Sequence, residues 1–215
     1  MGLYLHLKSS AMNFFSLLDL IGTFVFAISG TIAAGEKRLD LFGAAFIGFV
    51  TAIGGGTLRD MMIGISPVSW TSSMAYLYVI ILAVIITFFL KEQIFRFRRT
   101  IFLFDTIGIG VFTIIGVEKA LANGINTPVA IIMGILTAVA GGVIRDTLNN
   151  EVPQIFKKEI YATACFAGAV VYILLKRFGI QTEANQVATI LIIIGIRVIS
   201  VKQQLGLPRM DFRAQ

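Results

Sequence analysis

The chain has 215 residues, of which 57% are hydrophobic and 14% charged, and its mean hydropathy is +0.88. This composition excludes a water-soluble globular protein and predicts an all-α protein that crosses a membrane several times. The net charge of +6 does not indicate a nucleic-acid partner, because the basic residues fall in short segments between apolar runs.

A helix that spans the hydrocarbon core of a bilayer needs about 20 consecutive apolar residues. Seven segments of the chain meet this requirement, and they predict a single transmembrane domain over residues 1–215. The predicted spans cover about 14–34, 41–63, 72–90, 101–120, 128–149, 159–176 and 186–202.

The first span places Asp19, Gly22, Phe26 and Gly30 at helical spacings, so these residues lie along one face. Ionisable residues within a span usually face a bundle interior or water. Asp19 is therefore a candidate for an ion pathway, while the glycines are typical of close helix packing.

The second span has a small residue at every fourth position, at Ala44, Gly48 and Ala52 and then at Gly56. Such rows let helix backbones approach closely in lipid. The fifth span has the same row, at Ala130, Gly134, Ala138 and Gly142. We therefore expect the second and fifth spans to contact each other through these rows.

The second span also contains the motif Gly54-Gly55-Gly56-Thr57-Leu58-Arg59-Asp60. Three successive glycines remove roughly 3 kcal/mol of helix stability relative to alanine. We expect them to form a non-helical break that turns Arg59 and Asp60 towards a wet interior. The fifth span has the related motif Gly141-Gly142-Val143-Ile144-Arg145-Asp146, where Ala140 replaces the first glycine and predicts a weaker break.

These motifs belong to a longer repeat, because a shift of 86 residues (141 minus 55) aligns the first three spans with the next three. The predicted domain therefore contains a three-span unit at about 14–90, a second copy at about 100–176 and a seventh span at about 186–202. Three is an odd number, so the second copy must enter the membrane from the opposite side, which predicts an inverted 3+3 repeat. The identical pairs include Asp19 with Asp105, Gly30 with Gly116, Thr51 with Thr137, Arg59 with Arg145, Asp60 with Asp146 and Pro67 with Pro153.

The third and sixth spans are more plainly apolar and are expected to form walls. Their tyrosines, such as Tyr76 and Tyr161, are interpreted as anchors at the membrane interface. In the seventh span Arg197 lies near one end, where its side chain could extend to the interface.

Basic residues gather in alternate loops, which predicts an outside N-terminus and a cytoplasmic C-terminus. One side holds Lys37, Arg38, Lys91, Arg96, Arg98, Arg99, Lys157, Lys158, Lys202, Arg209 and Arg213, whereas the other holds Lys8, Lys119, Lys176 and Arg177.

The polar and glycine residues of the repeats predict an ion pathway. Its four aspartates and two arginines give a formal charge of 2 minus 4, or −2, which favours cations. Cys165 is the only cysteine, so no thiolate metal cluster is available, and we expect no cofactor and no enzymatic activity. The candidate pathway residues are Asp19, Thr51, Gly54, Gly55, Gly56, Arg59, Asp60, Asp105, Thr137, Gly141, Gly142, Arg145 and Asp146.

With both glycine motifs and the stretch Phe104-Asp105-Thr106-Ile107-Gly108, the sequence resembles the trimeric intracellular cation (TRIC) channel family. Prokaryotic relatives of that family include proteins described as glycine transporters. The resemblance implies a homotrimer in which each subunit has its own pore, lined by kinked second and fifth spans and conducting potassium and other monovalent cations. Since the chain stops soon after the seventh span, the plasma (inner) membrane of a prokaryote is expected, with membrane lipids as further partners.

Two other hypotheses remain open at this point. Paired opposite charges could hold the ammonium and carboxylate of an amino acid, which would suit a secondary transporter of glycine or another small zwitterion. The Arg-Asp pairs could also simply pin helices together in a scaffold that transports nothing.

Overall fold

The computed structural model describes residues 2–92, 100–157 and 160–206, with side chains from Phe14 onward. Within these residues the chain forms seven α-helices, one for each predicted span, and two short 3₁₀ helices. The α-helices are α1 (Gly2–Glu36), α2 (Leu41–Met62), α3 (Met74–Phe89), α5 (Thr100–Ala122), α6 (Thr127–Leu148), α7 (Ala162–Arg177) and α8 (Thr182–Lys202), and the 3₁₀ helices are η1 (Ser69–Ser72) and η2 (Gln154–Phe156).

Five helices are long and apolar enough to cross a membrane, namely α1, α2, α5, α6 and α8. The remaining two, α3 and α7, have 16 residues each, which corresponds to about 24 Å at 1.5 Å per residue. They are therefore shorter than the bilayer core of about 30 Å.

The starts of α2 and α6 follow from matching capping residues. The side chain of Asp40 accepts a hydrogen bond from the backbone N–H of Gly43, and that of Asn126 accepts one from Val129. Each bond satisfies a backbone donor that the first helical turn leaves without a partner. Asn126 lies 86 residues after Asp40, so the two halves begin their second helix in the same way.

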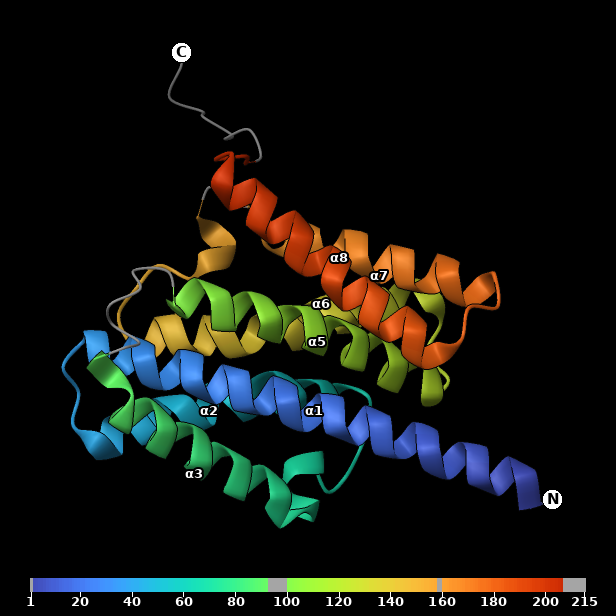
Figure 1. Ribbon diagram of the computed structural model, residues 1–215, viewed down its shortest axis with the longest axis horizontal. Coiled ribbons are helices and arrows are strands. Elements are labelled where there is room, and N and C mark those ends of the chain that lie inside the picture. Colours follow the sequence, from blue (N-terminus) through green and yellow to red (C-terminus); the bar gives the residue numbers. More distant parts are fainter. Residues whose placement is uncertain (1, 93–99, 158–159, 207–215) are drawn as a thin grey trace.

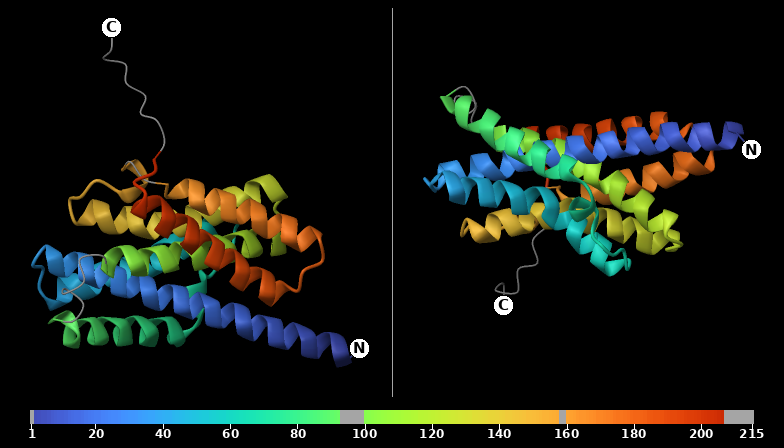
Figure 2. Two further views of the ribbon diagram at one scale, coloured as in Figure 1. Left: turned by 45° about the horizontal axis from the view of Figure 1, so that its top comes forward. Right: turned by 90° about the horizontal axis from the view of Figure 1, so that it is seen from below.

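Four helices, α1, α2, α5 and α6, form the centre of the molecule (Figure 1). α3 packs on one outer side of this centre against α1 and α2, and α7 and α8 cover the other side (Figures 1 and 2). α1 and α5 run in opposite directions (Figure 1).

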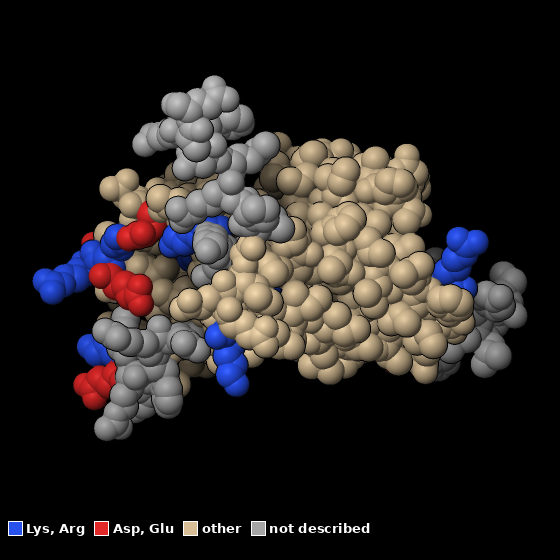
Figure 3. Space-filling view, turned by 90° about the horizontal axis from the view of Figure 1, so that it is seen from above, with Lys and Arg blue, Asp and Glu red and all other residues tan. Residues whose placement is uncertain are grey.

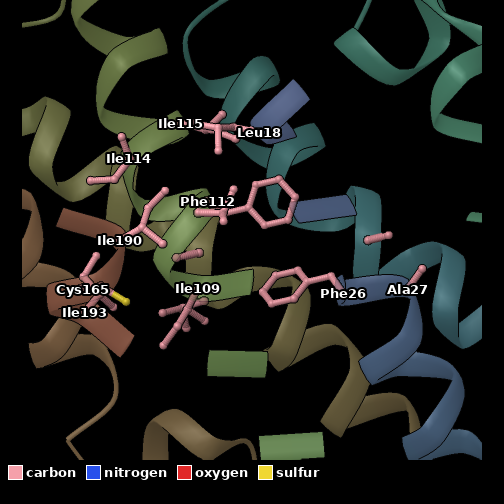
Figure 4. Packing of buried hydrophobic residues seen from close by; sticks show 14 of the residues in the cluster. Leu18, Phe26, Ala27, Ile109, Phe112, Ile114, Ile115, Cys165, Ile190 and Ile193 are labelled. Carbon is pink, nitrogen blue, oxygen red and sulfur yellow. The ribbon is translucent and has the colours of Figure 1, made fainter. Parts of the chain in front are cut away.

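The contact between α1 and α5 is built around two phenylalanines. The ring centroids of Phe26 and Phe112 lie 5.0 Å apart, and both rings point into the core between the helices (Figure 4). Gly108 makes room for Phe26, because a Cβ at Gly108 would lie 2.1 Å from that ring. Gly22 does the same for Phe112, with a Cβ position 3.1 Å from the ring.

The predicted breaks in the second and fifth spans are wrong, because α2 is a continuous α-helix through Gly54, Gly55 and Gly56. α6 is likewise continuous through Gly141 and Gly142. The reason is packing: a Cβ on Gly55 would lie 2.0 Å from the carbonyl oxygen of Thr137, and one on Gly141 would lie 2.3 Å from that of Thr51. Close approach between helices outweighs the low helix propensity of glycine.

α2 and α6 do contact each other, as predicted, but not through the whole predicted rows. Gly48 faces α1, since its Cβ would lie 3.0 Å from the carbonyl oxygen of Ala27. Gly134 faces α5, with a Cβ position 2.7 Å from the carbonyl oxygen of Thr113. The rows therefore join helices within each half, while Gly55 and Gly141 join the halves.

Charged side chains on the face seen in Figure 3 gather mainly at one end, and the middle of that face is largely uncharged. Glu36, Lys37 and Glu151 are exposed, and Lys37 forms an ion pair with Glu151. Several basic residues that set the predicted orientation lie outside the described residues, namely Arg96, Arg98, Arg99, Lys158, Arg209 and Arg213, as does the side chain of Lys8.

Candidate functional site

A cluster of buried and half-buried polar side chains surrounds Asp60 near the end of α2; we call it the Asp60 cluster (Asp19, Arg59, Asp60, Ser69, Tyr76 and Lys119). Asp60 is 1% exposed. Its Oδ1 accepts from Arg59 Nε at 2.8 Å, and its Oδ2 accepts from the N–H of Ser69 at 2.8 Å. The η1 segment thus folds back to cover the carboxylate, which supplies the compensation that a buried charge requires.

Asp19 reaches the same cluster from α1. Its Oδ2 accepts a hydrogen bond from the Tyr76 hydroxyl at 2.5 Å. Asp19, Arg59 and Asp60 line one small cavity, in which the volume open to the centre of a water molecule is about 20 Å³. About 10 to 15 Å³ on this measure suffices for one water, so the cavity holds little more than that.

Lys119 enters the cluster from α5. Its ammonium nitrogen lies 3.1 Å from Oδ1 and 3.3 Å from Oδ2 of Asp60, and it also donates to the Ser69 hydroxyl. The predicted place of Lys119 in a loop is wrong, because α5 continues to Ala122 and carries the Lys119 side chain towards Asp60.

A second set surrounds Asp146 near the end of α6; we call it the Asp146 cluster (Ser29, Asp105, Arg145, Asp146, Gln154, Tyr161 and Arg197). Arg145 is its centre and is 1% exposed. The guanidinium donates to Asp146 Oδ1 at 2.8 Å, to Asp105 Oδ1 at 2.7 Å and to the Ser29 hydroxyl at 2.6 Å. Asp146 Oδ2 accepts from the N–H of Gln154 in η2 at 3.0 Å, much as Asp60 accepts from η1.

Arg197 is fully buried, so its predicted extension to the interface is wrong. It donates to the carbonyl oxygen of Ile160 at 3.0 Å and to Gln154 Oε1 at 3.3 Å. Its guanidinium carbon also lies 4.8 Å from the ring centroid of Tyr161, a favourable cation–π geometry. Tyr161 is 2% exposed and is a core residue rather than an interfacial anchor.

Several buried polar atoms of the Asp146 cluster have no hydrogen-bond partner among the described residues: Asp105 Oδ2, Arg145 Nη2 and the Tyr161 hydroxyl. They gather beside Gly142, where a Cβ would lie 3.0 Å from the Tyr161 hydroxyl and 3.7 Å from Arg145 Nη2. A buried polar group without a hydrogen-bond partner destabilises the folded protein unless a water molecule or an ion supplies the missing interaction. The Asp60 cluster has one such atom, Arg59 Nη1.

The two clusters lie on opposite sides of the contact between α2 and α6. These helices are antiparallel, because Thr51 meets Gly141 whereas Gly55 meets Thr137. Asp60 follows the contact along α2 and Asp146 follows it along α6. The clusters are therefore at opposite ends of the central four-helix group, as the repeat predicts for Asp19 and Asp105.

The predicted excess of negative charge is wrong once Lys119 and Arg197 are included. In the Asp60 cluster, Arg59 and Lys119 balance Asp19 and Asp60, which gives 2 minus 2, or zero. In the Asp146 cluster, Arg145 and Arg197 balance two aspartates in the same way. A cation that enters either cluster must compete with a cation supplied by the protein.

Three of the remaining predicted site residues, Thr51, Thr137 and Gly54, lie at the contact between α2 and α6, and the fourth, Gly56, borders the Asp60 cluster. The hydroxyls of Thr51 and Thr137 donate to carbonyl oxygens of their own helices, at Ile47 and Met133, both at 2.6 Å. Gly54 packs beside Ile144 of α6, with a Cβ position 2.6 Å from Ile144 Cδ1. Gly56 lines the small cavity beside Arg59.

Sequence reasoning missed Lys119, Tyr76, Tyr161 and the role of Arg197. The signal for Lys119 was present, since it falls inside the predicted span 101–120 and has the apolar Ala33 as its counterpart in the repeat. A lysine within a span indicates a functional or paired position.

The comparisons with known proteins agree with this architecture. A family model described as "Glycine transporter" matches residues 16–92 and 102–177, which are the two halves of the repeat. A UPF0126 membrane protein of Vibrio cholerae is 39% identical over 193 residues, covering 89% of this chain and 81% of the relative. The inner membrane protein YadS of Escherichia coli is also 39% identical over 193 residues, covering 89% and 93%, and YvgT of Bacillus subtilis is 32% identical over 201 residues, covering 92% and 96%.

Solved structures of TRIC proteins have the same fold. The TRIC orthologue of Rhodobacter sphaeroides superimposes with a TM-score of 0.84 at 34% identity, covering 89% of this chain and 98% of that one. A TRIC cation channel structure that addresses conductance gives 0.82 at 33% identity, covering 93% and 98%. The chain is therefore a membrane protein of the family whose model is described as "Glycine transporter", which is the TRIC family.

Proposed function

We propose that the protein is a channel for monovalent cations, including potassium, in the inner membrane of a prokaryote. We further propose that it assembles as a homotrimer in which each subunit has its own pore. The similarity to TRIC cation channels, at 33 to 34% identity over most of the chain, supports this function. The observation that carries it is the pair of buried charged clusters on either side of the contact between α2 and α6.

In this proposal the ion path runs between α1, α2, α5 and α6, past Asp19 and Asp60 at one end and Asp105 and Asp146 at the other. Carboxylate oxygens are suitable ligands for a cation that has lost part of its hydration shell. Gly56 and Gly142 leave space beside Arg59 and Arg145 because they carry no side chain. We place the narrowest part of this path near Thr51 and Thr137, because the backbones of α2 and α6 are in contact there.

The conformation described here corresponds to a closed state of that path. The ammonium group of Lys119 forms an ion pair with the carboxylate of Asp60, and the adjacent cavity holds about one water. Conduction then requires Lys119 to leave Asp60, so that a mobile cation can take the place of the tethered one.

The two halves are proposed to form an inverted repeat with the N-terminus outside and the C-terminus in the cytoplasm. Two observations support the inversion: α1 and α5 run in opposite directions (Figure 1), and Gly55 meets Thr137 as Gly141 meets Thr51, which makes α2 and α6 antiparallel. The distribution of basic residues supports the orientation.

The test is to record currents from the purified protein in planar bilayers with a potassium chloride gradient. We expect single-channel steps whose reversal potential shifts towards the potassium equilibrium potential. A parallel measurement of labelled glycine in liposomes separates the alternative. Saturable glycine uptake with counterflow, in protein that passes no current, would overturn the channel in favour of a transporter.

A further inference from the structure

Two successive residues of α5, Glu118 and Lys119, bind different neighbouring helices. Lys119 is bound to Asp60 of α2, as described above. Glu118 faces α7, where its Oε1 accepts a hydrogen bond from the Tyr172 hydroxyl and another from the ammonium group of Lys176 at 2.9 Å. Adjacent residues belong to the same helical turn but point to different sides of the helix. The two attachments therefore hold one turn of α5 between α2 and α7.

Helix α8, which has no counterpart in the repeat, is hydrogen-bonded to the part of α7 that carries Tyr172. Asn185 Nδ2 donates to the backbone carbonyl of Tyr172 at 3.0 Å, and the Thr189 hydroxyl donates to Asn185 Oδ1 at 3.2 Å. Tyr172, Asn185 and Thr189 are all fully buried. Polar side chains buried in this way fix the position of the helices that carry them.

The other half of the chain lacks this attachment. In the 86-residue repeat, Glu118 and Lys119 correspond to Ile32 and Ala33, which carry no charge. Because α8 is not duplicated either, the chain of hydrogen bonds from α8 through Tyr172 and Glu118 ends at one cluster only, the Asp60 cluster.

We infer that Tyr172 and Glu118 form a clamp that keeps Lys119 on Asp60 and so favours the closed path. This inference rests on the proposed function. If Lys119 leaves Asp60 by a shift of the last turns of α5, Glu118 must move away from Tyr172 and Lys176. The clamp therefore stabilises the closed state relative to the open one, which is what a positioning residue has to do to regulate a two-state path.

Tyr172→Phe is the sharpest test, because it removes only the hydroxyl and keeps the ring in its buried place. In bilayer recordings we expect the ratio of open to closed time to rise about tenfold, the effect of losing one hydrogen bond to a charged group. The conductance of a single open channel should not change, since Tyr172 does not line the path. Tyr78→Phe is the matched control, because Tyr78 is 64% exposed on α3 and should leave both quantities at the parental values.

A second variant separates failure of the clamp from failure of the path. Lys119→Met should raise the open fraction by itself, and adding Tyr172→Phe should then raise it no further. If Lys119→Met changes nothing, the closed path in the proposed function is wrong, and the clamp has nothing to act on. If Lys119→Met opens the channel but Tyr172→Phe does not, or if Tyr172→Phe acts equally without Lys119, the clamp is wrong while the path stands.

Lys176→Met covers the case in which Tyr172→Phe does not fold, because the methionine side chain has no group that can donate a hydrogen bond to Glu118. Lys176 is half exposed, so its replacement leaves the core intact while removing one of the two bonds to Glu118. We expect a smaller increase in the open fraction, in the same direction. An open fraction equal to that of the parent in this variant would overturn the clamp.

Discussion

Gly55 lies directly against the backbone of Thr137, so closely that a Cβ on Gly55 would sit 2.0 Å from the carbonyl oxygen. The reciprocal contact joins Gly141 to Thr51. These contacts join the two halves of the chain at the centre of the membrane domain. A carbonyl oxygen is part of a helix backbone and cannot rotate aside as a side chain can.

Gly55→Ala should therefore force α2 and α6 apart. Overpacking of this kind costs about 1 to 3 kcal/mol, which exceeds the gain of up to about 1 kcal/mol in helix propensity. We expect a lower melting temperature in detergent for Gly55→Ala and for Gly141→Ala.

The neighbouring glycines are the controls. A Cβ on Gly56 would lie 3.6 Å from Arg59 Nη2, an ordinary contact. One on Gly54 would come closer than 3.9 Å only to the flexible end of Ile144, at 2.6 Å from its Cδ1. Gly56→Ala should be neutral or stabilising, and Gly54→Ala should fall between the two. Equal melting temperatures for all four variants, Gly54→Ala, Gly55→Ala, Gly56→Ala and Gly141→Ala, would contradict the helix contact described here.

Arg145→Met should destabilise the protein strongly. The guanidinium pairs with both Asp105 and Asp146, and its removal leaves two carboxylates buried without a cation between them. Breaking a buried pair from one side costs about 3 to 5 kcal/mol. Thermal unfolding followed by circular dichroism measures the loss, and Arg177→Met, at an exposed site on α7, should have little effect. A melting temperature for Arg145→Met close to that of the Arg177 variant would show that the ion pairs do not stabilise the fold.

Asp60→Asn and Asp146→Asn should reduce the conductance of the single open channel in folded protein, because each removes a charge beside the proposed path while keeping the shape of the side chain. One unit charge a few ångströms from a cation, at the intermediate dielectric of a protein site, is worth several kcal/mol at most. A reduction in conductance of at least a few fold is therefore expected. Asp40→Asn is the matched control, since asparagine also caps a helix and Asp40 is exposed. If Asp60→Asn and Asp146→Asn had the same conductance as the parent and as Asp40→Asn, the role of Asp60 and Asp146 would be purely structural.

The sequence predicted the seven helices and the duplicated polar positions, such as Asp19 with Asp105 and Arg59 with Arg145, because both follow from periodicity and repeat. It did not predict that α2 stays helical at Gly54 to Gly56, since propensity describes an isolated helix and not one packed against the carbonyl of Thr137. It also missed Lys119 and Arg197, because neither has a charged counterpart in the repeat. The repeat identifies only residues that occur in both halves, whereas Lys119 and Arg197, which neutralise the two clusters, each occur once.

The ion pair between Lys37 and Glu151 predicts a dependence of stability on pH and salt. It joins the turn after α1 to the segment after α6, and both side chains are largely exposed. The ammonium of Lys37 holds the pKa of the Glu151 carboxyl below its usual value of 4.5. Because the folded-state pKa is depressed, the pair contributes its stability above about pH 4.5 and loses it as the pH falls through the folded-state pKa.

Glu151→Gln should therefore lower the melting temperature slightly at pH 7 and low salt, and the difference from the parent should disappear in acid. It should also shrink at 1 M salt, where the screening length is about 3 Å. The neighbouring Glu36→Gln serves as a control, since Glu36 is exposed at the same end of the molecule and is not the partner of Lys37. If the Glu151 variant differed from the parent by the same amount at pH 7 and at pH 3, the effect would have to come from local packing rather than from charge.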